Sequence, residues 1–519
     1  MEQTGLRKSL DQIEKEQWNP KPSLLDLPIT PVQQFDFIPD IELKPLPELS
    51  LNGQWEMAEG GYTHERLSGQ WDDAMPATVP GTIHTALLEN GKIPDPMFGR
   101  NDKIARENSY RIWWMKCTFS SENIPENPWL VFDGVCYRAR FWLNGVYLGE
   151  HGGMFGGPEY PISHIISETN TLIVRIENAP ANPFAYSEHA DYDEGWKNGV
   201  VVNCVYGWHY ACIPTRGIWK PVRIVSRPAV RLERPFVSAR SKNGVVDVCF
   251  TIINDLDVSL KGKVTGIIRP KNFKGKSCAF TLDVNLNQGE NSYHVEVTVP
   301  DPQLWWPNGH GLQPLYFIDI SFEDMAGMVQ SCTDTFGIRT IEMAPLPGGP
   351  REDTYNWTFV INDKPIFVKG SNWCTIDALM RFSKEKYYRF LSLAKEQGIQ
   401  LLRAWGGGMP ETDTFYELCD ELGIMVIQEW PTCWDSHKLQ PPAELYETIR
   451  YNVPRLRNHP SLIQWAGGNE SPQADGEVMD EMARLTYELD GSRCFRRTSP
   501  WGGSIHNYDT YWGKQDIDV

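Results

Sequence analysis

The sequence predicts a multidomain protein in which two β-sandwiches precede part of a (β/α)8 TIM barrel. Three observations lead to this fold class. The chain has 519 residues, which is more than one hydrophobic core supports. Up to about residue 343, short alternating apolar runs are separated by Gly, Pro and Asn, as in antiparallel sheets. After residue 351, apolar runs alternate with amphipathic segments, which predicts parallel strands covered by helices.

The composition excludes several classes of protein. The net charge is −18 and no basic stripe is present, which argues against nucleic acid as a partner. The 20 Trp, 20 Tyr and 21 Phe suit a sugar-binding cleft or an ordinary core, and composition alone favours the core. The 11 Cys are scattered without a Cys-x-x-Cys pair, so we expect reduced thiols and neither a disulfide framework nor a zinc site.

The N-terminal residues 1–48 are polar and rich in proline, and we expect an arm or linker laid over the first domain. Met1–Gln17 lacks the apolar region of a signal peptide, and no apolar run is long enough to cross a membrane. A cytoplasmic location is therefore expected, or a periplasmic or secreted one if the start of the chain is misassigned.

Two all-β domains are expected next. Residues 49–228 have the strand spacing of a jelly roll, and residues 229–343 have that of an immunoglobulin-like sandwich. The clearest strands of the first are Trp129–Asp133, Ala139–Leu143 before the turn Asn144-Gly145, and Thr171–Glu177. Those of the second are Asp247–Ile253, Gly262–Ile268 and Ser292–Val299.

Residues 344–519 are predicted to be the N-terminal part of a TIM barrel, entered through the linker Ala344–Arg351. The expected strands are Ile366–Gly370, Ile399–Trp405, Ile424–Pro431, Leu462–Ala466 and Arg496–Trp501. The expected helices begin after the cap Ser383 and near Thr412, Pro442 and Gly476. In the first helix one face carries Tyr387, Phe390, Leu391 and Ala394. Because a complete barrel has eight strands and about 250 residues, the five units predict an incomplete barrel.

Polar and aromatic residues gather where these strands end, which is the edge at which parallel barrels build their sites. The candidate substrate-binding residues there are Trp373, Asp377, Arg403, Trp405, Glu429, Asn469, Trp501 and His506. A structural role is an equal alternative for some of them: an ion pair between Arg403 and Glu429, and a place in the core for Trp405.

Glu470 is the candidate catalytic residue. It follows an apolar strand, two glycines and Asn469, so no solvated helix face accounts for a carboxylate there. Burial among aromatic side chains raises the pKa of a carboxyl group and allows it to act as a general acid at neutral pH. Such an acid protonates a departing glycosidic oxygen.

Several motifs along the chain carry a family resemblance. They are Val79–Thr85 with Ile93–Pro96 and Gly99–Asn101, Asn144-Gly145 with His151–Phe155, Pro214–Trp219, Leu304–Gly309, Phe336–Arg339, Lys369–Trp373, Arg403–Gly408 and Gly468–Glu470. In this order they resemble glycoside hydrolase family 2, and within it the β-mannosidase-like branch, which is related to exo-β-glucosaminidase and β-galactosidase. The resemblance covers about residues 50 to 512.

The resemblance implies a sugar-binding jelly roll, an immunoglobulin-like domain and a barrel that hydrolyses terminal β-linked sugars from oligosaccharides or glycoconjugates with retention. Glu470 corresponds to the acid/base and Asn469 to the residue that binds the sugar 2-hydroxyl. Trp373, Arg403 and His506 correspond to pocket residues. No metal or organic cofactor is implied. A homodimer or a complementing C-terminal chain stays open.

Two features depart from the family pattern. The family places its nucleophile after the seventh barrel strand, so the nucleophile is expected to be absent from this chain. The loop that the jelly roll sends into the site reads Gly207-Trp208-His209-Tyr210, whereas β-mannosidases carry Gly-Trp-Asp-Trp. Trp208 and His209 are therefore candidate substrate-binding residues with an altered hydrogen-bond pattern toward the sugar.

Two other interpretations remain. The chain is a catalytically inactive carbohydrate-binding fragment or pseudoenzyme, or it does not fold stably, because an open barrel exposes the edges of its sheet.

Overall fold

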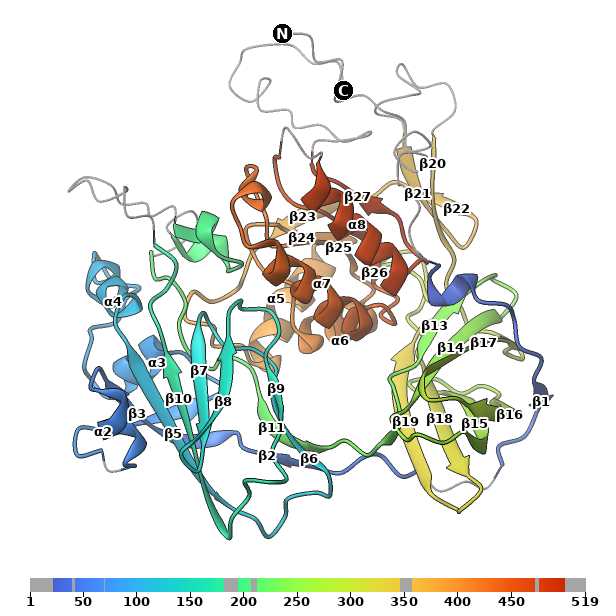
Figure 1. The fold of residues 1–519 in the computed structure, drawn as a ribbon. Coiled ribbons are helices and arrows are strands. Elements are labelled where there is room, and N and C mark those ends of the chain that lie inside the picture. The colour runs from blue at the N-terminus through green and yellow to red at the C-terminus, as the bar shows by residue number, and fades with distance from the viewer. Residues whose placement is uncertain are drawn as a thin grey trace, which may run out of the picture.

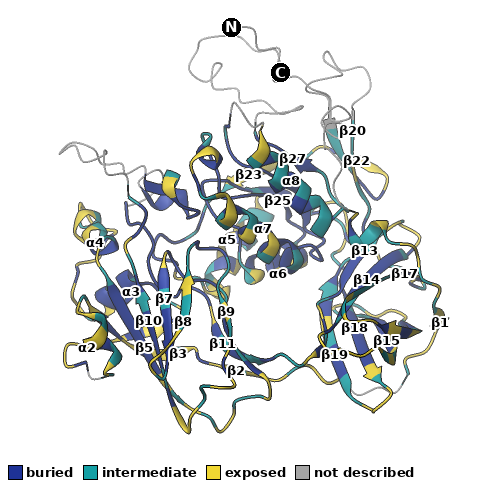
Figure 2. Cartoon of the chain, viewed as in Figure 1, coloured by how far each residue is buried: buried dark blue, intermediate teal, exposed yellow. Residues whose placement is uncertain are grey.

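The computed structural model describes residues 22–39, 43–69, 71–181, 195–206, 212–345, 357–471 and 476–499. Within these residues the chain forms two β-sandwiches and one α/β part. Figure 1 shows the sandwiches at lower left and lower right, with the α/β part above and between them. Figure 2 shows that buried residues are concentrated in the strands of all three parts.

The first sandwich confirms the predicted jelly-roll strands. Its six-stranded sheet has the order β4-β3-β5-β10-β7-β8 and its four-stranded sheet the order β2-β11-β6-β9. The strands are β2 Glu48–Ser50, β3 Gly53–Glu59, β4 Met75–Val79, β5 Trp113–Ser120, β6 Pro128–Phe132, β7 Ala139–Leu143, β8 Val146–His151, β9 Glu159–Pro161, β10 Thr169–Ile176 and β11 Val222–Ser226. Helices α2 Thr63–Leu67, α3 Ile83–Glu89 and α4 Asp102–Ser109 lie within the domain. The turn Asn144-Gly145 joins β7 and β8 with φ values of 52° and 79°, as a two-residue hairpin requires.

The second sandwich contains the three strands predicted for it. One sheet consists of β12 Val230–Leu232, β13 Phe236–Ala239, β14 Val245–Asn254 and β17 Gly289–Thr298. The other has the order β1-β16-β15-β18-β19, with β1 Gln33–Phe35, β15 Leu260–Pro270, β16 Cys278–Leu286, β18 Tyr316–Asp324 and β19 Val329–Phe336.

The α/β part has five parallel strands in sequential order with a helix between each pair, as expected for part of a TIM barrel. The strands are β23 Gly370–Trp373, β24 Leu401–Ala404, β25 Met425–Glu429, β26 Leu462–Ala466 and β27 Phe495–Arg496. The helices are α5 Lys384–Glu396, α6 Asp413–Leu422, α7 Pro442–Leu456 and α8 Glu477–Leu489. Ser383 accepts a backbone N–H group at the first turn of α5, so the predicted cap is confirmed. Thr412 does the same for α6, which begins where it was expected, although no cap was predicted there.

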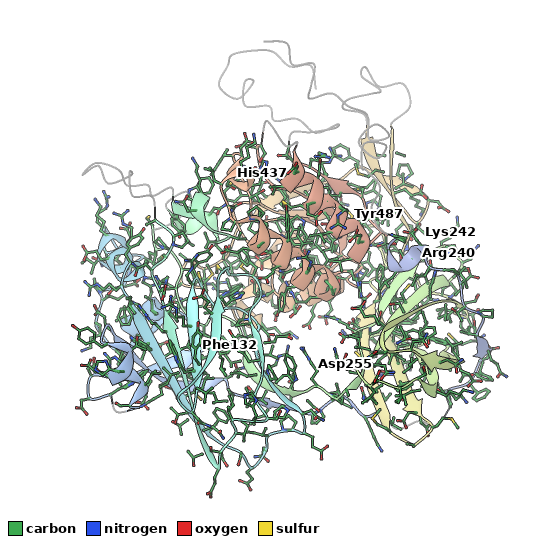
Figure 3. All side chains as sticks on the ribbon, viewed as in Figure 1. Phe132, Arg240, Lys242, Asp255, His437 and Tyr487 are labelled. Carbon is green, nitrogen blue, oxygen red and sulfur yellow. The ribbon has the colours of Figure 1, made fainter. Side chains whose placement is uncertain are left out.

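The prediction that the N-terminal arm (residues 1–48) covers the first domain is wrong for residues 22–39, whereas the end of the arm joins the first sandwich, where Glu48 pairs with Val225 of β11. Strand β1 pairs with β16, and the 3-10 helix η2 (Leu24–Asp26) lies against β14 and β17, all in the second sandwich. The His294 ring binds the Leu27 carbonyl at 2.8 Å. Tyr487 on α8, which is labelled in Figure 3, donates to Asp26 at 3.2 Å. An edge strand with unpaired backbone groups attracts such an arm, and β16 offers that edge.

The first barrel strand was predicted at Ile366–Gly370 and is wrongly placed. Ile366 ends β22 (Lys364–Ile366), which pairs with β21 (Trp357–Ile361), while β20 (Ile341–Pro345) pairs with β21 on its other side. Asn362 and Asp363 form the turn with positive φ, and the parallel strand begins only at Gly370. Ile366 packs with Leu401 and Met425, the first residues of β24 and β25, so this hairpin lies at the N-terminal end of the strands.

Two smaller predictions also need correction. The last strand is Phe495–Arg496, two residues long, and residues 500–501 of the predicted strand lie outside the described residues. Phe390 is not on the buried face of α5: Tyr387 and Leu391 are buried, whereas Phe390 is 45% exposed. Tyr388 and Leu393 of α5 are also exposed, by 54% and 48%.

The second sandwich docks at the N-terminal end of the barrel strands through two of the family motifs. Trp305 donates its indole N–H to the Asp420 carbonyl at 2.8 Å, and the Asn308 side chain donates to the Ile399 carbonyl at 3.0 Å. The buried Arg339 guanidinium donates to the carbonyls of Pro460 and Leu462 at 2.9 and 2.8 Å. These motifs therefore hold two domains together.

The first sandwich contacts the barrel through Lys220. Its ammonium lies 4.9 Å from the Trp219 ring centre and 5.6 Å from that of Tyr451 on α7. Burial, together with repulsion by Arg455, lowers the pKa of Lys220 to about 7, although Asp413, Asp133 and Glu411 oppose the shift.

We predict that Arg339→Ala lowers the free energy of unfolding by about 3–5 kcal/mol, because two hydrogen bonds from a buried charge are lost. Urea unfolding measures this difference. Arg389→Ala, which removes an exposed arginine of α5, is the control and should change stability by less than about 0.5 kcal/mol. Equal effects of the two substitutions would contradict a docking role for Arg339.

We predict that Lys220 makes stability rise with pH above about 7. Folded Lys220 loses its proton near pH 7, whereas unfolded lysine keeps it to about pH 10.4, so the unfolded state binds more protons in between. Relative to Lys220→Met, the native chain should therefore gain up to about 1.4 kcal/mol of unfolding free energy per pH unit. Urea unfolding at pH 7.5, 8.5 and 9.5 tests this. If the free energy of unfolding changed equally with pH in the native chain and in Lys220→Met, Lys220 would not be neutral in the folded protein.

Candidate active site

Several of the predicted site residues lie where β24, β25 and β26 finish: Arg403, Trp405, Glu429, Asn469 and Glu470. After β26 the chain passes two glycines and continues alongside its neighbours: the Asn469 N–H donates to the Thr432 carbonyl at 3.0 Å, and the Glu470 N–H donates to the Ser499 carbonyl at 2.9 Å. A Cβ on Gly468 would lie 1.9 Å from the Thr432 hydroxyl oxygen. Glycine is thus needed at this point because the backbone segment that carries Thr432 approaches closely just before Asn469 and Glu470.

Arg403 connects the polar groups at this edge. Its guanidinium donates to both oxygens of Glu429, at 2.6 and 3.0 Å, and also to the side-chain oxygens of Asn469 at 2.8 Å and Asn372 at 3.1 Å. The ion pair that the sequence left as an alternative is therefore present. The same guanidinium also orients Asn469, so the structural role and a role in the site are compatible.

Glu429 serves this network as a buried anion. Its side chain is 1% exposed, and its Oε2 also accepts the Gly406 N–H at 2.7 Å. Paired, hydrogen-bonded charges are the form in which burial is tolerated. Glu429 is thus positioned to hold Arg403 and not to react with a substrate.

Glu470 has a different environment from Glu429. It is partly exposed, and its Oε2 accepts the Trp434 indole N–H at 2.6 Å. Its φ of 45° lies in the left-handed region, which is uncommon for a residue with a side chain and frequent at functional sites. Trp434 was missed by the sequence reasoning; its only signal is an aromatic residue shortly after the third barrel strand.

Aromatic rings from two domains surround Trp434. The Trp405 ring centre lies 6.0 Å from it and the Trp196 ring centre 5.5 Å from it, both edge to face. Trp405 is 6% exposed and belongs to the large core cluster, so the alternative of a core position is correct. Trp196 lies on the 3-10 helix η3 (Gly195–Asn198) of the first domain.

A segment of the first domain therefore covers this edge of the barrel. It contains η3 and the 3-10 helix η4 (Asn203–Tyr206). The Cys204 N–H donates to the Gly407 carbonyl at 2.8 Å, and the Asn203 side chain donates to the Gly406 carbonyl at 3.4 Å. The glycines after Trp405 thus supply the backbone on which this segment rests.

Trp373 and Asp377 lie after β23 and have their own partners. Trp373 donates its indole N–H to Glu411 at 2.9 Å, and Tyr387 donates to the other Glu411 oxygen at 2.7 Å. Asp377 binds Arg381 and Lys386. Burial alone would raise the pKa of Asp377, but these two cations lower it below its ordinary value. The role of both residues toward a sugar stays a prediction.

Four other predicted site residues, Trp208, His209, Trp501 and His506, lie outside the described residues. Their roles also stay predictions.

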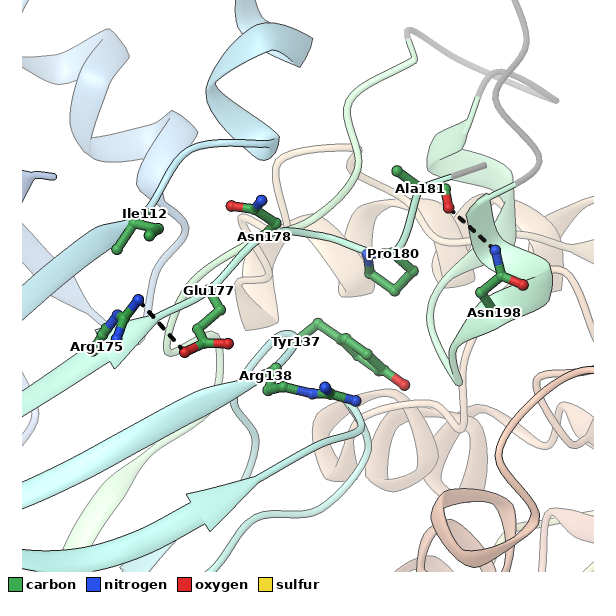
Figure 4. Close-up of a pocket in the computed structure, with 9 residues that line it drawn as sticks. All are labelled: Ile112, Tyr137, Arg138, Arg175, Glu177, Asn178, Pro180, Ala181 and Asn198. Atoms are coloured by element: carbon green, nitrogen blue, oxygen red, sulfur yellow. Dashed lines mark hydrogen bonds and ion pairs between the residues drawn. The ribbon is translucent and has the colours of Figure 1, made fainter. Parts of the chain in front are cut away.

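A cavity of about 380 Å³ lies on the first domain (Figure 4). It is lined by Ile112, Tyr137, Arg138, Arg175, Glu177, Asn178, Pro180, Ala181 and Asn198. Its one carboxylate, Glu177, pairs with Arg140 at 3.2 Å and Arg175 at 3.8 Å. Because the lining carboxylate is paired with two arginines, this cavity is poorly suited to acid catalysis, and the candidate active site is the edge that carries Glu470.

In the described part of the chain, no group of three or more His, Cys, Asp or Glu side chains is placed to hold a metal ion. No helix among those described is both long and apolar enough to cross a membrane.

Three family descriptions match successive parts of the chain. Residues 55–220 match "Glycosyl hydrolase 2 galactose-binding domain-like", residues 230–339 match "Glycosyl hydrolases family 2", and residues 354–501 match "Glycosyl hydrolases family 2, TIM barrel domain". The chain belongs to glycosyl hydrolase family 2.

Within this family the chain is similar to β-mannosidases. It is 30% identical over 464 residues to "Beta-mannosidase" of Rattus norvegicus, covering 82% of this chain and 50% of the relative. It is 28% identical to "Beta-mannosidase B" of Emericella nidulans, covering 88% of this chain and 61% of that protein. The chain thus spans about half the length of the curated relatives it matches.

Solved structures agree with this placement. The crystal structure of β-D-mannosidase from Dictyoglomus thermophilum has a TM-score of 0.76 at 28% identity, covering 91% of this chain and 61% of that chain. The exo-chitosanase CsxA of Amycolatopsis orientalis has a TM-score of 0.71 at 18% identity, covering 89% and 55%, and shows the fold alone.

Proposed function

We propose that this chain supplies the general acid/base of an exo-acting, retaining β-glycosidase that removes terminal β-linked sugars from oligosaccharides or glycoconjugates. The observation that carries the proposal is the placement of Glu470: it is partly exposed at a barrel strand end, beside an oriented asparagine and among tryptophans. The likeness to β-mannosidases supports a terminal β-mannoside as the preferred substrate.

In this reaction Glu470 protonates the glycosidic oxygen as its bond to the anomeric carbon breaks, and a carboxylate nucleophile attacks that carbon from the opposite face. Glu470, now ionised, then removes a proton from the water that releases the sugar. Asn469 turns its side-chain oxygen toward Arg403, which leaves its NH2 group as the donor for a sugar hydroxyl.

The nucleophile has to lie about 5–5.5 Å from the acid/base in a retaining enzyme. Glu429 does not suit this role because Arg403 and the Gly406 N–H engage both of its oxygens. We therefore assign the nucleophile to residues other than these strand-end carboxylates.

We predict hydrolysis of 4-nitrophenyl β-mannoside in preference to the β-galactoside and the β-glucosaminide by a C-terminally extended form of this chain. Glu470→Ala should lower kcat by about 10²–10⁴-fold, because water then attacks the glycosyl-enzyme without a general base. Azide should restore turnover by attacking the glycosyl-enzyme and yield a β-glycosyl azide.

Glu477→Ala, at an exposed position of α8, is the matched control and should keep full activity. Full activity of Glu470→Ala would exclude the acid/base role. An extended form that turns over none of the three glycosides would exclude the enzyme assignment.

A further inference from the structure

We propose that Trp434 is a positioning residue for Glu470: its indole N–H fixes the orientation of the carboxyl group and directs the acidic proton to Oε1. This inference rests on the proposed acid/base role of Glu470. It begins with the 2.6 Å hydrogen bond from Trp434 Nε1 to Glu470 Oε2.

The chemistry of the donor determines which oxygen carries the proton. An indole N–H donates only, and at ordinary pH it neither gains nor loses a proton. In a protonated carboxyl group the carbonyl oxygen is the better acceptor, so the oxygen facing Trp434 is the carbonyl oxygen and the proton is on Oε1. Trp434 therefore orients the carboxyl group and cannot itself take the proton.

The backbone around Trp434 is held in an unusual conformation. Trp434 and Asp435 have φ values of 50° and 61°, both in the left-handed region. The Trp434 N–H donates to the Asn469 carbonyl at 2.9 Å, and the Asp435 N–H donates to the Ser471 hydroxyl at 3.3 Å. The turn that carries Trp434 is thus bonded to the residues on both sides of Glu470.

The ring of Trp434 is also held from the side. It packs edge to face against Trp196 at 5.5 Å and Trp405 at 6.0 Å. Trp196 is 1% exposed and comes from the first domain. Since a rigid donor loses little freedom when it binds, these contacts make the hydrogen bond to Glu470 directional. The first domain thereby supports the acid/base through Trp434.

Trp434→Phe tests the role because it keeps an aromatic ring and removes the donor. A hydrogen bond to the ionised form lowers the pKa of a carboxyl group, so the substitution should raise the pKa of Glu470 by about one unit. The chain is labelled with 13C at the glutamate carboxyl carbons and titrated by NMR, and the Glu470 resonance is assigned by its loss in Glu470→Gln.

A second measurement on the unsubstituted chain covers the case in which Trp434→Phe does not fold. The indole 15N–H resonance of Trp434 is identified by its change in Glu470→Gln. As the pH is varied, its chemical shift should change with the same midpoint as that of the Glu470 carboxyl carbon. Trp306→Phe changes a partly buried tryptophan of the second sandwich at its contact with the barrel; it is the control and should leave the Glu470 titration unchanged.

A Glu470 pKa that changes by less than about 0.3 unit in Trp434→Phe, or an indole resonance that does not titrate with Glu470, would overturn the inference. Neither readout depends on hydrolysis. A failure of Trp434 positioning is therefore distinguishable from a failure of the proposed glycosidase, which the azide experiment reports.

Discussion

The guanidinium of Arg403 is the group on which the candidate site depends. It lies on the second barrel strand and binds Asn372 on the first, Glu429 on the third and Asn469 after the fourth. Glu429 is almost fully buried, and a buried carboxylate is stable only with such a partner. Arg403 therefore joins four strand ends, and Asn469 is oriented as a consequence of a charge pair that the fold itself requires.

The two sandwiches pack against opposite ends of the parallel barrel sheet. The second sandwich binds the N-terminal end through Trp305, Asn308 and Arg339. The first sandwich reaches the C-terminal end, where Trp196 packs against Trp434. The family motifs of the second sandwich thus have a physical purpose, because they fix the base of the barrel. The wall around Glu470 is completed by Trp196, which lies in a segment of the first domain outside the family motifs.

Local patterns were sufficient for the domain order, the cap Ser383, the start of a helix near Thr412, and the strand end at Asn469 and Glu470. Local patterns failed where contacts with residues distant in the sequence determine the structure. The arm pairs β1 with β16, some 250 residues later, which no local pattern encodes. Ile366 belongs to an apolar run that suits a barrel strand or a hairpin equally. Trp434 acquires its place through a left-handed turn and a contact with a residue 36 positions away.

If the edge with Asn469 and Glu470 binds the sugar, a crystal structure of the Glu470→Gln variant soaked with an aryl β-mannoside should show the sugar there. We predict a pyranose ring at hydrogen-bond distance from the Asn469 side chain, next to residue 470 and the Trp434 ring. A ring found only in the cavity of the first domain lined by Arg138 and Arg175, or no ring at all, would contradict the account.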